Sequence, residues 1–122
     1  MKINIKRIIK DIRGNEAKMS FPQSPEDTKK PETVENILLN ALAAYPVEER
    51  KQVFYVNHIA SAILGAGEDG TVEIKDEYAD FLKDAVYAAT FRKEEQGGKI
   101  TEKGVYLPLV TAQVLEELGV TE

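Results

Sequence analysis

Acidic side chains are the first candidates for chemistry in this sequence, because adjacent carboxylate pairs recur along it. General acid and base catalysis needs two carboxylates that face each other across a cleft in different environments. Adjacent residues on a helix point about 100° apart and share the solvent, so we interpret the pairs as solvated helix faces and partners of helix dipoles. The pairs are Glu48-Glu49, Asp76-Glu77, Glu94-Glu95 and Glu116-Glu117.

The sequence contains a single histidine, His58, and no cysteine. The lack of cysteine excludes disulfides, thiol nucleophiles, iron–sulfur clusters and cysteine zinc sites. A single histidine excludes histidine-rich metal clusters unless a second subunit supplies further ligands. Ser61 could share a hydrogen bond with His58, but the third member of a catalytic triad is missing. We interpret His58 as a surface or interface residue, with a pH-sensing or ligand-binding role as the alternative.

Three glycine-containing segments share only single features with known ligand loops. Asp69-Gly70 lacks the acidic positions of a calcium loop, and Gly65-Ala66-Gly67 precedes a turn instead of opening a helix after a strand. Gly97-Gly98-Lys99 does not have the spacing of a phosphate-binding loop. We therefore predict turns and helix ends at these positions, and no cofactor and no metal.

The overall charge of the chain is −5, from 16 basic and 21 acidic residues. This balance is opposite to that of a surface that binds nucleic acid phosphates, so direct nucleic acid binding is not expected. The longest apolar stretches are shorter than the ~20 residues that cross a bilayer. No apolar run follows the basic N-terminus, as a secretory signal would require. We expect neither a membrane segment nor an export signal.

The first part of the chain alternates apolar and polar residues, with turn residues at Arg13 to Glu16. Alternation around a turn is typical of a β-hairpin. The following residues, 22–32, contain three prolines and no other apolar side chain, so they predict a linker. The predicted organisation is an N-terminal β-hairpin at 1–21, a proline-rich linker at 22–32 and a helical domain at 33–122.

Four amphipathic helices are predicted in the helical domain, because apolar residues recur there at the spacing of one helical face. Between them, Val72 to Ile74 predicts a short edge strand or an extended connection, and Arg92 to Gly104 an exposed, mobile excursion. The fold class is therefore mainly α, with a small N-terminal β-hairpin. The first helix follows Thr33 and ends at Pro46, the second runs from Pro46 to about Leu64, the third starts at Asp76, and the fourth lies between Leu107 and Gly119.

Aromatic placement is the most informative pattern in the sequence. The apolar stripe of the second helix leaves Phe54 and Tyr55 outside it, and that of the third helix leaves Tyr87 and Phe91 outside. One explanation is that both helices are buried on two sides, beneath the hairpin and the 92–104 segment. The other is that these rings are anchors of a protein interface. The stripe predicted for the second helix consists of Val53, Val56, Ala60, Ile63 and Leu64.

The order of several short motifs resembles a family of small, mostly uncharacterised proteins of double-stranded DNA bacteriophages and prophages. The motifs are a strand and turn at Lys10–Asn15, a helix at Val34–Leu42, a strand running into a helix at Val72–Lys83, and a Pro-Leu-Val helix at Leu107–Glu116. The chain differs from the family in its proline-rich linker and in the charged segment before the last helix. The motifs are apolar, and the family offers no catalytic residues to carry over.

The resemblance and the missing chemistry together imply a non-enzymatic bacteriophage protein that acts by protein–protein association, in virion or tail assembly. The expected contact residues are Phe54, Tyr55, Tyr87 and Phe91, and the partner is another protein or a second copy. The alternative is an inhibitor of a host enzyme or defence system, whose acidic third helix binds a basic site. An enzyme or small-ligand binder is a third class, because pockets between helices need no motif. The expected location is the host cytoplasm or the virion.

Overall fold

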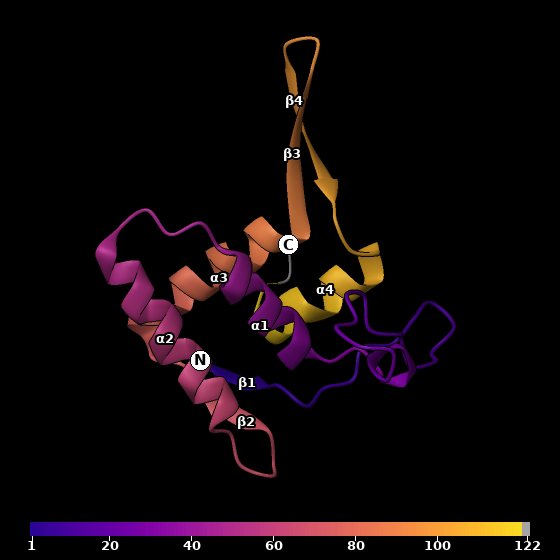
Figure 1. The fold of residues 1–122 in the computed structure, drawn as a ribbon, viewed down its shortest axis with the longest axis vertical. Helices are drawn as coiled ribbons and strands as arrows, with labels where there is room; N and C mark the ends of the chain where they lie inside the picture. The colour runs from indigo at the N-terminus through magenta and orange to yellow at the C-terminus, as the bar shows by residue number, and fades with distance from the viewer. Residues whose placement is uncertain (121–122) are drawn as a thin grey trace.

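The computed structural model describes residues 1–120, apart from the side chains of Arg92, Glu102 and Lys103. Over these residues the chain is mostly helical, as predicted, and adds two small antiparallel sheets of two strands each (Figure 1). The elements in chain order are β1 (Lys2–Asn4), the short 3-10 helix η1 (Asp27–Lys29), α1 (Val34–Ala44), α2 (Arg50–Leu64), β2 (Thr71–Glu73), α3 (Asp76–Thr90), β3 (Phe91–Gln96), β4 (Lys99–Gly104) and α4 (Pro108–Glu117).

The helices α1 and α3 pack against each other at the centre, with α2 and α4 on opposite sides of them (Figure 1). Thr33 caps α1 as predicted, because its Oγ1 accepts a hydrogen bond from the backbone N–H of Asn36 at 3.3 Å. The apolar faces predicted for α1 and α3 are confirmed as the buried ones. Their buried apolar residues are Val34, Ile37, Leu38, Ala41 and Leu42 in α1, and Phe81, Leu82, Ala85 and Val86 in α3.

The predicted N-terminal hairpin is formed only next to its turn, where Lys10 bridges Glu16 and the backbone N–H of Ala17 donates to the carbonyl of Ile9 at 2.9 Å. The first strand does not take part in it, because β1 pairs with β2. Ile3 lies opposite Val72, and both side chains are buried. Ile5 and Ile74 continue the same alternation into the core. The two strands thus add their apolar faces to one core, and this burial decides the pairing.

The rest of the N-terminal segment forms a turn and then folds back onto the start of α1. Asp11 Oδ1 accepts hydrogen bonds from the backbone N–H groups of Arg13 and Asn15, both at 2.9 Å. The proline-rich residues 22–32 include η1 and return to the core at Glu32, which is buried. Isolated β-bridges hold this path, and they join Ile8 to Thr33, Lys10 to Glu16, and Lys18 to Pro31.

The helix α2 differs from its prediction in its start and in its buried face. It begins at Arg50 and not at Pro46, because Glu49 and Gln52 form a capping box that fixes the first turn. The buried face is rotated relative to the predicted stripe, of which Ile63 is buried and Val56 and Ala60 are half-buried. Ile59, which lay outside that stripe, is fully buried, whereas Val53 and Leu64 are 52% and 70% exposed.

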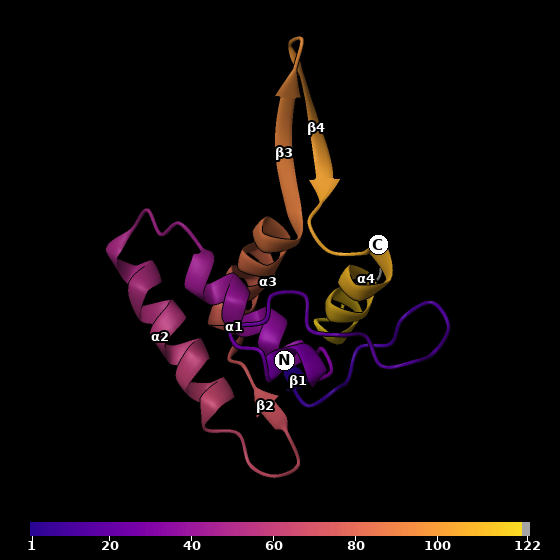
Figure 2. The ribbon, with the colours of Figure 1, turned by 45° about the vertical axis from the view of Figure 1, so that its right-hand side comes forward.

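The segment predicted as a mobile excursion is an ordered β-hairpin, β3–β4, which we call the arm. Gly97 and Gly98 form its two-residue turn, with φ angles of 59° and 81° that glycine adopts without strain. The backbone N–H of Val105 donates to the carbonyl of Thr90 at 2.8 Å and closes the base of the arm. The arm projects away from the helices and covers none of them (Figure 1 and Figure 2).

Two glycines with positive φ provide a matched test of the turn before β2. Gly70 has φ +71°, and a Cβ built there would lie 2.6 Å from Lys6 Cγ, whereas Gly14, with φ +82°, has open space around it. We expect Gly14→Ala to lower the free energy of unfolding by about 1 kcal/mol through backbone strain, and Gly70→Ala by about 2 kcal/mol through strain and displacement of Lys6. Urea denaturation of both variants measures the difference. Equal losses would contradict the close packing of Lys6 on this turn.

Candidate functional site

The outer side of α2 carries an apolar surface that the rest of the chain leaves uncovered. Val53, Phe54 and Leu64 are 52%, 59% and 70% exposed, and we call these three residues the α2 face. Val53 and Leu64 are eleven residues apart, which is close to three helical turns, so they lie on the same side of the helix. Residues 52–67 contain no Asp, Glu, Lys or Arg. Phe54 points about 100° away from Val53, and the exposed polar residues Asn57 and Ser61 lie between Val53 and Leu64, so the three apolar side chains are separate exposed positions on an uncharged helix surface.

Tyr55 was expected beside Phe54 on this surface, but the structure turns it inward. Its ring lies 5.0 Å from that of Tyr78 and 5.7 Å from that of Phe81, and the side chain is half-buried. Tyr45 completes the aromatic cluster, with its ring 5.1 Å from Phe81. Tyr55 therefore helps to fix α2 against α3, and Phe54 is the exposed ring of the pair.

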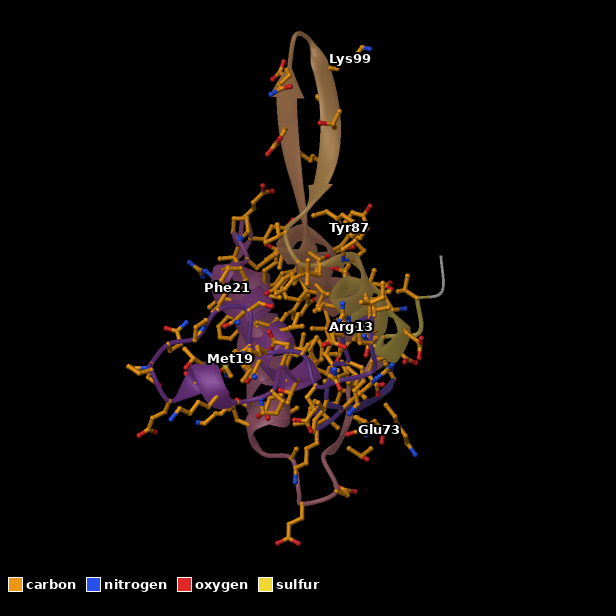
Figure 3. The ribbon with its side chains drawn as sticks, turned by 90° about the vertical axis from the view of Figure 1, so that its right-hand side faces the viewer. Arg13, Met19, Phe21, Glu73, Tyr87 and Lys99 are labelled. Carbon is orange, nitrogen blue, oxygen red and sulfur yellow. The ribbon has the colours of Figure 1, made fainter. Side chains whose placement is uncertain are left out.

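Tyr87 and Phe91, both outside the stripe of the third helix, come together at the end of α3 where the arm begins. Their ring centroids are 4.7 Å apart. Tyr87 is exposed (Figure 3). Phe91 is half-buried. The arm projects away from the helices (Figure 2) and Tyr87 is 46% exposed, so the explanation that the 92–104 segment buries the Tyr87 ring is not supported.

His58 is exposed on α2 and stacks on Tyr78, with ring centroids 5.5 Å apart and an angle of 13° between the planes. Both residues lie at the edge of the aromatic cluster around Tyr55. This placement agrees with the interpretation of His58 as a surface or interface residue.

A second apolar surface, which the sequence did not predict, is a groove between the turn at Ile12 and the start of α4. Ile12 is 90% exposed, Leu107 is 74% exposed and Leu109 is partly exposed. The groove encloses about 560 Å³, and we call it the α4 groove. Leu109 lies outside the helical stripe of its segment, and this was the one available sign of a second apolar face. Asp11, Ile12, Leu107, Pro108, Leu109, Val110 and Ala112 line the groove.

Gln113 holds the two walls of the α4 groove together. The backbone N–H of Lys10 donates to Gln113 Oε1 at 3.0 Å, and Gln113 Nε2 donates to the carbonyl of Lys10 at 2.7 Å. The side-chain amide thus pairs with the backbone as a neighbouring β-strand would. Because this pairing fixes the turn that carries Ile12, the groove is largely formed in the free chain.

A second cavity, of about 430 Å³, lies beneath the proline-rich segment, between Met19, Phe21 and the outer side of α1 (Figure 3). Buried Glu32 anchors this segment, because its Oε2 accepts from the backbone N–H of Ser20 at 2.8 Å and its Oε1 from that of Thr33 at 3.2 Å. The ring of Phe21 meets the ring of Tyr106 edge-on at 5.4 Å. Burial and, to a smaller extent, the charge of Glu32 raise the pKa of Tyr106 above its ordinary value.

The outer side of α3 carries a run of exposed carboxylates. Asp76, Glu77, Asp80 and Asp84 are all exposed, and Asp80 and Asp84 are one helical turn apart. The run leads toward Tyr87, so an acidic strip and an exposed ring share this part of the molecule.

Within residues 1–120, leaving aside the side chains of Arg92, Glu102 and Lys103, no cluster of three or more acidic or histidine side chains has the arrangement of a metal site. None of the helices in that range is long and apolar enough to cross a membrane. In comparisons with known proteins, no protein-family model, no curated protein and no solved structure matches this chain.

Proposed function

We propose that this chain is a non-enzymatic bacteriophage protein that acts by binding another protein during virion or tail assembly. The observation that carries the proposal is the α2 face, where the ring of Phe54 is 59% exposed on a part of the helix without charged residues. An apolar surface of this kind loses its contact with water when a partner covers it, and aromatic side chains are frequent anchors of interfaces.

The bacteriophage context is inferred from the resemblance in the order of short motifs. The contact residues are inferred from the exposure of their side chains. Phe54 and Tyr87 are the exposed members of the expected set, so they are proposed to touch the partner directly. Tyr55 and Phe91 are half-buried and are proposed to support them from beneath.

We expect a photo-crosslinking amino acid at position 54 to form an adduct with one defined protein in cells that produce the phage. The reason is that an interface anchor lies within van der Waals distance of its partner. Mass spectrometry identifies the adduct, and the same amino acid at the exposed position Ala43 of α1 is the matched control. Phe54→Ser should then weaken binding of that partner at least about tenfold, because such anchors contribute more than 1.4 kcal/mol.

Two results would contradict this proposal. One is an adduct pattern that is the same at positions 54 and 43. The other is loss of cooperative thermal unfolding in Phe54→Ser, which would show that the ring belongs to the core. A component of the virion or the tail as the adduct would support the assembly role.

The exposed carboxylates of α3 favour the alternative, an inhibitor of a host enzyme or defence system that binds a basic site. Salt separates the two proposals, because charge attraction between exposed groups is screened beyond about 10 Å at 0.1 M salt. Binding through the acidic strip should weaken strongly as salt rises, and Asp80→Asn with Asp84→Asn should reproduce the loss at low salt. Binding through Phe54 should change little under the same conditions.

A further inference from the structure

We propose that the cavity beneath the proline-rich segment binds a guanidinium group, the cationic head of an arginine side chain. We call this cavity the loop cavity. It encloses about 430 Å³ between the outer side of α1 and the loop that carries Met19 and Phe21 (Figure 3). The inference goes beyond the proposed function and does not depend on the α2 face.

The loop cavity has an open mouth and a more enclosed floor. Phe21 and Lys30 are exposed at the mouth, whereas Glu35, Asn36 and Leu39 of α1 are half-buried at the floor. The hydrogen bonds of the buried Glu32 hold the loop in place, so the cavity is largely formed in the free chain. Its volume lies within the range of roughly 300 to 1,000 Å³ that is usual for ligand sites.

The start of α1 does not offer the donors that an anion would need. The backbone N–H groups of residues 34 and 35 donate to carbonyls of the N-terminal segment at 3.1 Å and 3.0 Å. The backbone N–H of Asn36 donates to Thr33 Oγ1 at 3.3 Å. Anions bind helix N-termini through such N–H groups when they are free, and here the chain itself occupies them.

One negative charge in the loop cavity is not compensated. Asp27 Oδ1 pairs with Lys30 Nζ at 3.3 Å, and Asp27 Oδ2 accepts from the backbone N–H of Gln23 at 3.1 Å. Lys30 is the one basic residue among the described residues that line the cavity. The carboxylate of Glu35 has neither an ion pair nor a hydrogen bond within the described part of the chain. The cavity therefore favours a cation.

Two asparagine side chains add hydrogen-bond acceptors to this carboxylate. Asn36 and Asn40 are one helical turn apart and both line the cavity. Burial and the charge of Glu32 raise the pKa of Tyr106, and a side-chain hydrogen bond with Asn40 lowers it. A hydrogen bond lowers the pKa of a phenol when it is donated to the phenol oxygen. Asn40 therefore uses an N–H group on Tyr106 and keeps its carbonyl oxygen as an acceptor.

A guanidinium group matches this lining better than an ammonium group does. It is planar, carries five N–H donors and no acceptor, and forms paired hydrogen bonds with a carboxylate. An ammonium group has three donors and is more strongly hydrated. The remaining lining suits the rest of an arginine side chain, because Met19 and Leu39 can cover its aliphatic stem and the ring of Phe21 attracts a cation to its face.

Binding of N-acetyl-arginine N-methylamide to the purified full-length chain tests the proposal. Nuclear magnetic resonance of the backbone N–H groups locates the binding, and we expect the signals that shift to lie within residues 19–40. The matched ligand is the citrulline compound with the same blocked ends, which keeps the planar shape but has no charge. It should bind at least about tenfold more weakly, because hydrogen bonds to charged groups are roughly twice as strong as neutral ones.

Glu35→Gln should weaken the binding of the arginine compound at least about tenfold, because it removes the free charge of the cavity. Glu77→Gln is the matched control, because Glu77 is the second residue of α3 as Glu35 is the second residue of α1, and it lies outside the cavity. Both variants lose the same interaction with a helix dipole, and only the first should lose affinity. Phe21→Leu should weaken binding about twofold to fivefold, the usual contribution of an exposed cation–π contact.

Three results would overturn the proposal. These are equal affinities for the arginine and citrulline compounds, unchanged affinity in Glu35→Gln, and signal shifts confined to the exposed carboxylates of α3. If Glu35→Gln does not fold, unchanged affinity in Phe21→Leu would overturn it instead. Free arginine as a further ligand distinguishes the source of the group. Tighter binding of the blocked compound indicates an arginine within a protein, tighter binding of the free amino acid indicates a small molecule, and both support the guanidinium site.

Discussion

Ile59→Ala is expected to lower the free energy of unfolding by about 2 to 5 kcal/mol, the usual cost of truncating a fully buried isoleucine. Ile59 is 0% exposed and lies on the side of α2 that faces the core. Leu64→Ala removes the same number of carbon atoms from the same helix, but Leu64 is 70% exposed. Its loss should stay below about 1 kcal/mol, because little buried surface disappears.

Urea denaturation of the two variants measures this contrast. If the unfolding free energy depends on urea concentration with the same slope in both variants, the two transitions are comparable. The opposite order, a large loss at Leu64 and a small one at Ile59, would restore the orientation of α2 that the sequence predicted. In that case the α2 face would be buried, and the proposed function, which depends on Phe54, would lose its main observation.

The misorientation of α2 has a simple physical cause. Around the axis of α2, the centre of the predicted stripe and the centre of the buried side that contains Tyr55 and Ile59 point in directions that differ by roughly 90°, given 100° per residue. Residues 52–67 carry no Asp, Glu, Lys or Arg that could mark the solvent side, so both stripes are apolar. What chooses between them is the contact of Tyr55 with Tyr78 and Phe81, which is a tertiary contact. In α3, by contrast, exposed acidic residues mark the outer side, and the periodicity alone was sufficient.

Glu32→Ala is expected to lower the free energy of unfolding by about 2 to 3 kcal/mol. The carboxylate accepts hydrogen bonds from the backbone N–H groups of Ser20 and Thr33, and a partly buried N–H group left without an acceptor costs about 1 to 3 kcal/mol. The milder variant Glu32→Gln keeps the size of the side chain and one acceptor oxygen. It should lose about half as much, because its amide group meets one of the two N–H donors.

A second measurement on Glu32→Ala separates its local effect from a general loss of packing. The charge of Glu32 contributes to the raised pKa of Tyr106, so its removal should bring that pKa closer to its ordinary value of 10.0. The raised pKa in the folded chain also means that stability is lost as the pH rises from about 10 through the folded pKa, because the unfolded tyrosine gives up its proton first. Titration by ultraviolet absorbance checks both effects. An unchanged Tyr106 pKa in a folded variant would contradict the contribution of Glu32.

Glu32 shows why the fold of the proline-rich segment could not be predicted from local periodicity. The sequence around it contains no apolar residue except proline, and this composition predicts a linker. Its burial results from the return of the chain onto residues 17–20 and from the nearby Tyr106. A long-range contact of this kind leaves no mark on local periodicity.

The candidate surfaces were predictable to different degrees for the same reason. Phe54 lay outside the stripe predicted for its helix, but the sequence left open whether the ring was exposed or covered by another segment, and the fold leaves it 59% exposed. Tyr87 and Phe91 are four residues apart on one helix, so their contact also followed. The α4 groove did not, because its walls at Ile12 and Leu107 are distant in sequence and meet only when Gln113 binds the backbone of Lys10.

The pairing of β1 with β2 also constrains the order in which the chain can fold. Lys2 lies opposite Glu73, so the first strand has no partner until more than half of the chain has been synthesised. Contacts between such distant residues slow folding, because the loop between them must close before the pairing contributes stability. During synthesis the apolar side chains of Ile3 and Ile5 therefore stay uncovered while α1 and α2 emerge, and the first residues of the chain are among the last to be secured.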